Sequence, residues 1–309
     1  MALTGTGQVS SSTGAFEQVA YFALRSNPLY EMIADVRSTA QTHNGASVTF
    51  DIYNNMTAVT APIAQAVDIA AVQLGDTTVT VTLQEHGNAA TTTAKLRGTS
   101  FLNVDADSAN IIGYNMVDSL DQVVAAVAAG GSNDILPVGR AATVNIIAGD
   151  TITADQTRTA AAKLRTASAP GWENGNYIGM IHPNVAFDLR SEADVTDVIA
   201  FQIRQDAAAV RNGSIGTWGG VEFIENPRAN IQTGAGAAGI DVYDTVIAGR
   251  QGLAKGFSRA AGFGEQPQIV YGPIVDSLRR FVTVGWYHLV GYERFREECL
   301  QRVESSSSL

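Results

Sequence analysis

The sequence predicts an α+β fold, and three observations carry that prediction. Segments that alternate with the two-residue period of strands are interleaved with segments of helical spacing, without the regular order of a doubly wound sheet. The 309 residues are 45% hydrophobic and 16% charged, which suits a globular protein with a large core. No run approaches the ~18 consecutive apolar residues of a membrane-spanning helix.

The N-terminal elements are an arm and two helical segments. Residues 1–15 are rich in Gly, Ser and Thr, so an arm without a core of its own is expected there. Apolar residues at helical spacing predict a helix from Phe16 to Leu24, which Asn27-Pro28 should end. The same spacing from Leu29 to Val36 predicts a further short helix.

Two strands joined by a long connection are predicted next. Residues 47–53 and 77–83 alternate with the strand period and should pair with each other. The connection, residues 54–76, is too long for a hairpin turn and too regular for a structureless tether. A projecting loop of this kind is expected to dock on another surface.

A long helix is predicted from Asp105 to Ala129. Its apolar stripe comprises Ile111, Ile112, Met116, Val117, Leu120, Val123, Val124 and Val127. Two aspartates in the first turn favour the helix N-terminus, and Gly130-Gly131 should end the helix. Asp118 and Asp121 lie beside or opposite the stripe, so both are expected to be solvated.

Shorter strands and helices make up the rest of the chain. The expected strands are residues 143–147, 177–181, 218–225, 242–248 and 281–292, and the expected helices are residues 153–166, 184–190 and 192–211. Thr153 and Gln156 form a capping box at the start of the first of these helices. Strands and helices therefore mix along the whole C-terminal half.

Charge is negative overall and unevenly distributed. The formal net charge of −10 disfavours tight non-specific binding to nucleic acid and disfavours an acidic substrate. Residues 38–139 hold nine carboxylates and two cationic side chains, whereas residues 250–302 hold eight cationic side chains and five carboxylates. Either ordinary surface variation or a head-to-tail contact between the acidic half of one subunit and the basic half of another explains this segregation.

No arrangement of residues predicts an active site. Gly234–Gly239 matches the G-x-G-x-x-G dinucleotide pattern, but no strand directly precedes it and a strand follows it, so a flexible loop is predicted. His182 ends a strand and is expected to bond to backbone, and no histidine has the spacing of a metal site. The single cysteine, Cys299, follows two glutamates that disfavour the thiolate, so a packed side chain is expected.

Three segments and the order of the elements resemble the major capsid proteins of tailed bacteriophages. The segments are Gly175–Pro183 followed by Phe187–Leu189, Gly216–Asn226, and Val284–Tyr292. Encapsulins and the herpesvirus capsid floor share the same fold. The resemblance covers nearly the whole chain and implies an N-terminal arm (residues 1–45), an extended loop (46–94), a peripheral domain with a long spine helix (95–140 and 265–309) and an axial domain (141–264).

The function implied by the resemblance is structural rather than enzymatic. The protein would self-assemble, as hexamers and pentamers, into an icosahedral shell that encloses double-stranded DNA without binding it specifically. It would assemble in the host cytoplasm without a membrane step and end in the virion capsid, with a separate scaffolding protein, a portal and a decoration protein as partners and no cofactor. Two alternatives stay open: an encapsulin that encloses a cargo enzyme, and an enzyme that binds a nucleotide at Gly234–Gly239.

The extended loop is expected to supply contacts between subunits. Its apolar contact residues are Val59, Pro62, Ile63, Val67, Ile69, Val72 and Leu74. The expected charge partners between subunits are Asp68, Asp76, Arg279 and Arg280. Some proteins of this fold crosslink through a lysine in this loop, but this chain has no lysine between Arg37 and Lys95, so no such crosslink is expected.

Overall fold

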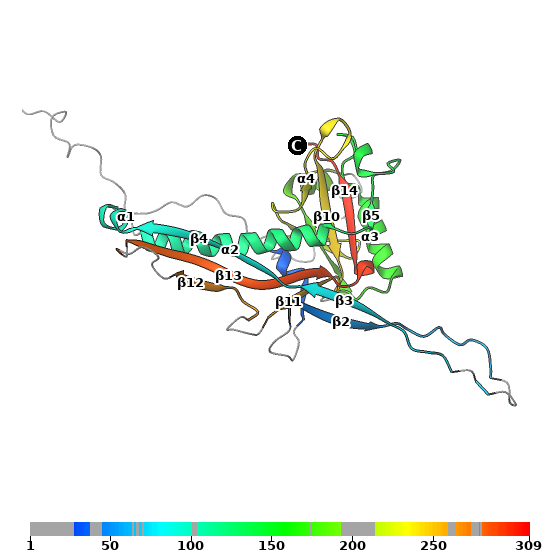
Figure 1. Ribbon diagram of the computed structural model, residues 1–309. Coiled ribbons are helices and arrows are strands. Elements are labelled where there is room, and N and C mark those ends of the chain that lie inside the picture. Colours follow the sequence, from blue (N-terminus) through cyan, green and yellow to red (C-terminus); the bar gives the residue numbers. More distant parts are fainter. Residues whose placement is uncertain are drawn as a thin grey trace, which may run out of the picture. The chain divides into compact units, whose positions relative to one another are not determined.

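The computed structural model describes most of the chain as two units that each mix helices and strands (Figure 1). The described residues are 28–37, 45–63, 65, 68, 69, 71–100, 104–172, 175–192, 214–258, 264–272, 278 and 280–309. Of the described residues, those within 87–116 and 269–286 form the smaller unit, and those within 28–86, 117–268 and 287–309 form the larger unit. The expected helix at residues 16–24, and residues 193–211 of the helix expected at 192–211, lie outside the described residues.

The smaller unit is built where three strands run alongside the start of a long helix. The elements that contribute to it are β4 (Gln84–Thr93), α1 (Ala94–Thr99), α2 (Val104–Ala129), β12 (Gln268–Gly272) and β13 (Phe281–Arg294). β4 and β12 both pair with β13. The side-chain oxygen of Asn115 accepts bonds from Trp286 Nε1 and Asn88 Nδ2, each at 3.0 Å. These bonds tie α2 to β13 and to β4.

The larger unit contains a seven-stranded sheet. Its strands are β5 (Asp134–Ile135), β14 (Leu300–Ser305), β10 (Val242–Ala248), β6 (Tyr177–Ile181), β8 (Val221–Glu225) and β7 (Ser214–Trp218) in spatial order, with β9 (Ile231–Gln232) beside β10. β10 is antiparallel to β14 and to β6, and all seven of its residues are buried. β5 and β14 therefore lie in this sheet, although the boundaries expected from the sequence group them with the peripheral domain.

Two helices share the hydrophobic core of that sheet. They are α3 (Ala154–Thr166) and α4 (Pro183–Ser191). Leu164 of α3 and Leu189 of α4 join Ile181, Phe223 and Ile247 of the sheet in one buried cluster. Short 3-10 turns, η3 (Thr143–Asn145), η6 (Ala237–Gly239) and η7 (Glu297–Cys299), lie in the connections.

A second group of strands in the larger unit carries a hairpin. Its elements are η2 (Tyr30–Ile33), β1 (Ala34–Arg37), β2 (Ser47–Tyr53), β3 (Asp76–Thr82) and β11 (Leu253–Phe257). β1 runs parallel to β11, and β11 is antiparallel to the last part of β13. β2 and β3 pair with each other from Ser47 opposite Thr82 to Tyr53 opposite Asp76.

Most of the longer predicted elements are confirmed. The strand pair predicted at residues 47–53 and 77–83 is β2–β3, and the predicted long helix is α2. Thr153 and Gln156 form the predicted capping box, which opens α3. Within the described part of the chain, no helix is both long and apolar enough to cross a membrane.

Three shorter predictions are wrong in part or in full. The helix predicted at residues 29–36 is only the turn η2, because Ala34 to Arg37 instead pair with β11 as β1. Residues 143–147 were predicted to form a strand, but Thr143–Asn145 form the 3-10 turn η3 instead. Ile146, which follows this turn, is fully buried. The single strand predicted at residues 218–225 is the end of β7 and all of β8, separated by a turn at Gly219-Gly220, where both glycines have positive φ.

Asp121 is also not solvated as predicted. It is 2% exposed, and its Oδ1 accepts a bond of 2.6 Å from the backbone N–H of Tyr30. Asn226 Nδ2 donates to the other oxygen at 3.4 Å. Burial raises the pKa of this carboxyl, although these bonds act in the opposite direction. Asp118, by contrast, is partly exposed and pairs with Arg228 at 2.9 Å.

Candidate intersubunit surface

The base of the β2–β3 hairpin is anchored by a small hydrophobic cluster. Val81, Ala254 and Phe295 are buried there, and Phe50 and Val79 pack against them. The rings of Phe50 and Phe295 meet edge to face, with 6.2 Å between their centroids and 89° between their planes. The hairpin therefore has a fixed base from which its connecting loop departs.

Two glycines allow the hairpin to lie this close to the neighbouring strands. A Cβ on Gly291 of β13 would lie 2.8 Å from Val81 Cγ1 and 2.9 Å from the carbonyl carbon of Thr82. A Cβ on Gly256 of β11 would lie 3.1 Å from the same Val81 atom. Because the contact at Gly291 is with backbone, a side chain there would require the hairpin to move.

The loop between the strands is exposed along its described length. The backbone N–H of Asn54 donates to the carbonyl of Gly75 at 3.0 Å and closes the mouth of the loop. Beyond that bond the two halves of the loop run outward with no other element beside them (Figure 1). Among the large apolar side chains described in the loop, the exposed fraction ranges from 58% for Met56 to 85% for Val59. Also exposed are Pro62, Ile63, Val72 and Leu74, whereas Val67 lies outside the described residues.

The four expected charge partners are partly described. Asp68 and Asp76 are exposed, and no ion pair within the described part of the chain includes either of them. Arg280 is exposed too, with its guanidinium carbon 5.4 Å from the centre of the Phe281 ring. Arg279 lies outside the described residues.

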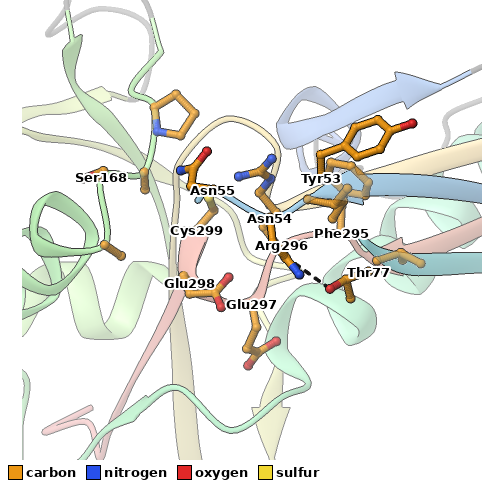
Figure 2. Close-up of a pocket in the computed structure, with 15 residues that line it drawn as sticks. Tyr53, Asn54, Asn55, Thr77, Ser168, Phe295, Arg296, Glu297, Glu298 and Cys299 are labelled. Carbon is orange, nitrogen blue, oxygen red and sulfur yellow. Dashed lines mark hydrogen bonds between the residues drawn. The ribbon is translucent and has the colours of Figure 1, made fainter. Parts of the chain in front are cut away.

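A cleft of about 390 Å³ lies at the base of the hairpin (Figure 2). Residues of β2 and β3 line it together with residues 167–170 and 295–299. Thr77 Oγ1 donates to Asn54 Oδ1 at 3.4 Å on the hairpin side. Burial raises the pKa of the Cys299 thiol, so this side chain is not a thiolate nucleophile at neutral pH. The prediction that Cys299 is a packed side chain is confirmed, since it is 3% exposed.

The other sequence candidates for chemistry are structural. Nδ1 of His182 accepts from the N–H of Asn184 at 3.2 Å and caps α4, as the backbone-bonding interpretation predicted. Burial lowers the pKa of His182, so the ring is neutral at pH 7. Gly234–Gly239 is a loop between β9 and β10 that contains only the 3-10 turn η6, and a strand rather than an α-helix follows it. Among the described residues, no three His, Cys, Asp or Glu side chains are grouped to hold a metal ion.

Further apolar side chains are exposed that the sequence did not predict to be exposed. In the smaller unit, Ile269, Val270 and Tyr271 are consecutive residues of β12 and are all at least 43% exposed. In the larger unit, Val138 is 93% exposed. Ile111, which the apolar stripe of α2 includes, is 52% exposed. Exposed apolar side chains therefore occur on several surfaces besides the loop. The spacing of apolar residues in the sequence does not show which of them are exposed and which lie in the core.

Comparison with known proteins gives the class of this chain. A sequence model of the phage capsid protein family matches residues 15–301. The solved capsid of Ralstonia phage GP4 is similar over 99% of this chain and 98% of its own, with a TM-score of 0.80 and 12% identity. The cyanophage Pam1 capsid is similar over 97% and 98%, with a TM-score of 0.74 and 13% identity. A comparison with curated protein sequences finds no match.

A third solved structure shares the same fold. The capsid of Helicobacter pylori bacteriophage KHP30 is similar over 96% of both chains, with a TM-score of 0.72 and 12% identity. These likenesses confirm the α+β fold of phage major capsid proteins. The chain belongs to the phage capsid protein family: it is a major capsid protein, a structural subunit that associates with copies of itself to form the shell of the virion.

Proposed function

We propose that this subunit forms a closed icosahedral shell of hexamers and pentamers around double-stranded DNA, and that loop 54–75 lies across a neighbouring copy as a brace. The observation that carries the proposal is the exposure of the loop, with apolar side chains along its whole described length. An isolated two-stranded ribbon is marginally stable in water. The apolar side chains of the loop therefore contribute little stability until another surface covers them. A neighbouring subunit supplies the surface that would bury it.

The apolar residues of the loop are the proposed contact residues. They are Val59, Pro62, Ile63, Val67, Ile69, Val72 and Leu74. Transfer of one such side chain from water contributes about 1.5 to 3 kcal/mol when burial is complete. Ordering the loop costs a comparable amount per residue, so each single brace is weak and the shell depends on many copies.

Charge supports the same assembly. Asp68 and Asp76 of one subunit are the proposed partners of Arg279 and Arg280 of the next, which joins the acidic half of one chain to the basic half of another. The net charge of −10 repels DNA phosphates. A shell made of this subunit would therefore enclose a genome without binding it tightly.

Other proteins are proposed to take part in assembly. The subunit would assemble in the host cytoplasm with a separate scaffolding protein and with a portal, and a decoration protein would bind the finished shell. The division into arm (1–45), extended loop (46–94), peripheral domain (95–140 and 265–309) and axial domain (141–264) belongs to this proposal. The exposed apolar residues of β12 are consistent with a peripheral domain that meets neighbours.

The proposal is tested by the size of the purified full-length protein. Light scattering during size-exclusion chromatography should detect species far above the 32.5 kDa of one chain. The measurement is made at high protein concentration, both alone and with the scaffolding protein. A strictly monomeric protein under both conditions would contradict the proposal.

The charge pairing has its own test by reversal and rescue. Replacing Arg279 and Arg280 by Glu should reduce the yield of closed particles, because like charges would then face each other between subunits. Adding Asp68→Arg and Asp76→Arg to that variant should restore the yield. Particle yields are counted by electron microscopy at low and at high salt, since salt screens exposed pairs. Equal yields for the parent and both variants would rule out the pairing.

A further inference from the structure

Two buried carboxylates lie opposite each other on the paired strands β10 and β14 of the seven-stranded sheet. Asp244 of β10 and Glu304 of β14 are direct partners in the antiparallel register. Asp244 is 1% exposed and Glu304 is 0% exposed. Like charges placed opposite each other on paired strands repel, and burial increases the cost because water does not screen them. The pair therefore needs either cations or protons.

Few charged groups surround this pair. Arg302 of β14 is the cation, and its Nη2 lies 2.9 Å from Glu304 Oε1 and 2.7 Å from Asp134 of β5. Tyr30 of η2, which is fully buried, faces Asp244 with its neutral phenol. The charged groups that shift the pKa of Asp244 are Arg302, which lowers it, and Glu304, which raises it. The guanidinium of Arg302 therefore interacts with three carboxylates, those of Asp134, Asp244 and Glu304.

Two amide side chains hold the pair from the side of β9. Asn230 Nδ2 donates to Asp244 Oδ2 at 2.5 Å. Gln232 Nε2 donates to Asp244 Oδ1 at 2.8 Å and, more weakly, to Glu304 Oε1 at 3.4 Å. Neither amide reaches Glu304 Oε2, which is buried and has no donor among the described residues. A buried carboxylate oxygen without a donor is costly, and the cost is greater when a second charged carboxylate lies opposite it.

We propose that Asp244 is a proton-binding site of the sheet, and that the bound proton removes the repulsion between Asp244 and Glu304 and so holds β14 against β10. A proton on Asp244 removes one of the two opposed charges. Arg302 then faces two carboxylates, Glu304 and Asp134, rather than three. The subunit would accordingly be held together more tightly at mildly acidic than at alkaline pH.

The sign of the effect follows from the titration of Asp244. Burial, with a further contribution from Glu304, raises the pKa of Asp244 to about 6 against the hydrogen bonds and Arg302, which act in the opposite direction. In the unfolded chain the pKa is about 3.9. The folded chain therefore binds more protons between these values, and the stabilisation present at low pH is lost as pH rises through about 6.

The test compares denaturant unfolding of the full-length protein and of Asp244→Asn from pH 5 to pH 8. Asparagine keeps the shape and carries no charge at any pH. We expect the unfolding equilibrium constant of the parent to rise about tenfold more over this range than that of Asp244→Asn. Asp155→Asn is the matched control, because Asp155 is exposed on α3, and it should keep the pH dependence of the parent. Equal pH dependence in the parent and Asp244→Asn would overturn the proposal.

A second measurement applies if Asp244→Asn does not fold. Infrared difference spectra of the folded parent between pH 5 and pH 8 should then contain the carbonyl band of a protonated, buried carboxylic acid that disappears near pH 6. Glu304→Gln should shift that disappearance to lower pH, because it removes the opposing charge. Absence of such a band in the parent would exclude the proton site.

Discussion

A subunit without residues 55–74 is expected to fold but to form no stable shell. The deletion joins Asn54 to Gly75 and leaves a two-residue Asn-Gly turn between Tyr53 and Asp76, which are paired in β2–β3. The turn has the length and composition that favour a hairpin, and the hydrophobic cluster at the base remains. Only the surface proposed to cross a neighbouring subunit is removed.

The size of the effect follows from the apolar area that the loop would bury. If four of its side chains are covered by a neighbour, the gross transfer free energy is roughly 6 to 12 kcal/mol at each contact. That gain recurs at every contact in the shell. The deletion variant should therefore remain as small species in light scattering, with a circular dichroism spectrum like that of the parent. Particles as heat-resistant as those of the parent would contradict the brace.

Gly291→Ala should have the second-largest effect, because it separates the hairpin from its support. Its new Cβ would meet the backbone of Thr82 and the side chain of Val81, which is fully buried. Overpacking of this kind costs about 1 to 3 kcal/mol, and here it would also change the direction in which the loop leaves the subunit. We expect a lower unfolding midpoint and few closed particles.

A matched glycine serves as the control for this variant. Gly113 lies in α2 with no atom within 4 Å of the position that a Cβ would take. Gly113→Ala should therefore be neutral or stabilise the helix by about 0.5 to 1 kcal/mol. If Gly291→Ala assembles and unfolds like Gly113→Ala, the close packing of the hairpin base has no role in assembly.

The sequence was most informative where a pattern is local and long. The alternation in residues 47–53 and 77–83 predicts β2–β3, because one face packs on the cluster around Phe295 and the other faces solvent. Apolar residues at helical spacing in residues 105–129 predict α2, and the two glycines after them predict where it ends. The exposed loop followed from its length and from the two strands that flank it.

Features that depend on distant residues could not be predicted. Asp121 is buried because Tyr30, 91 residues away, brings its N–H to the carboxylate. β4 was missed because most of its residues are exposed and its pattern does not alternate. The opposition of Asp244 and Glu304 depends on the pairing of β10 with β14, which no local pattern indicates.

The central claim is tested most directly by cryo-electron microscopy of particles assembled from the full-length protein. The map is predicted to contain closed icosahedral shells in which residues 54–75 of each subunit lie on an adjacent copy. Val59, Ile69 and Leu74 should be covered there. Closed shells in which this loop points into solvent and touches no neighbour would contradict the account.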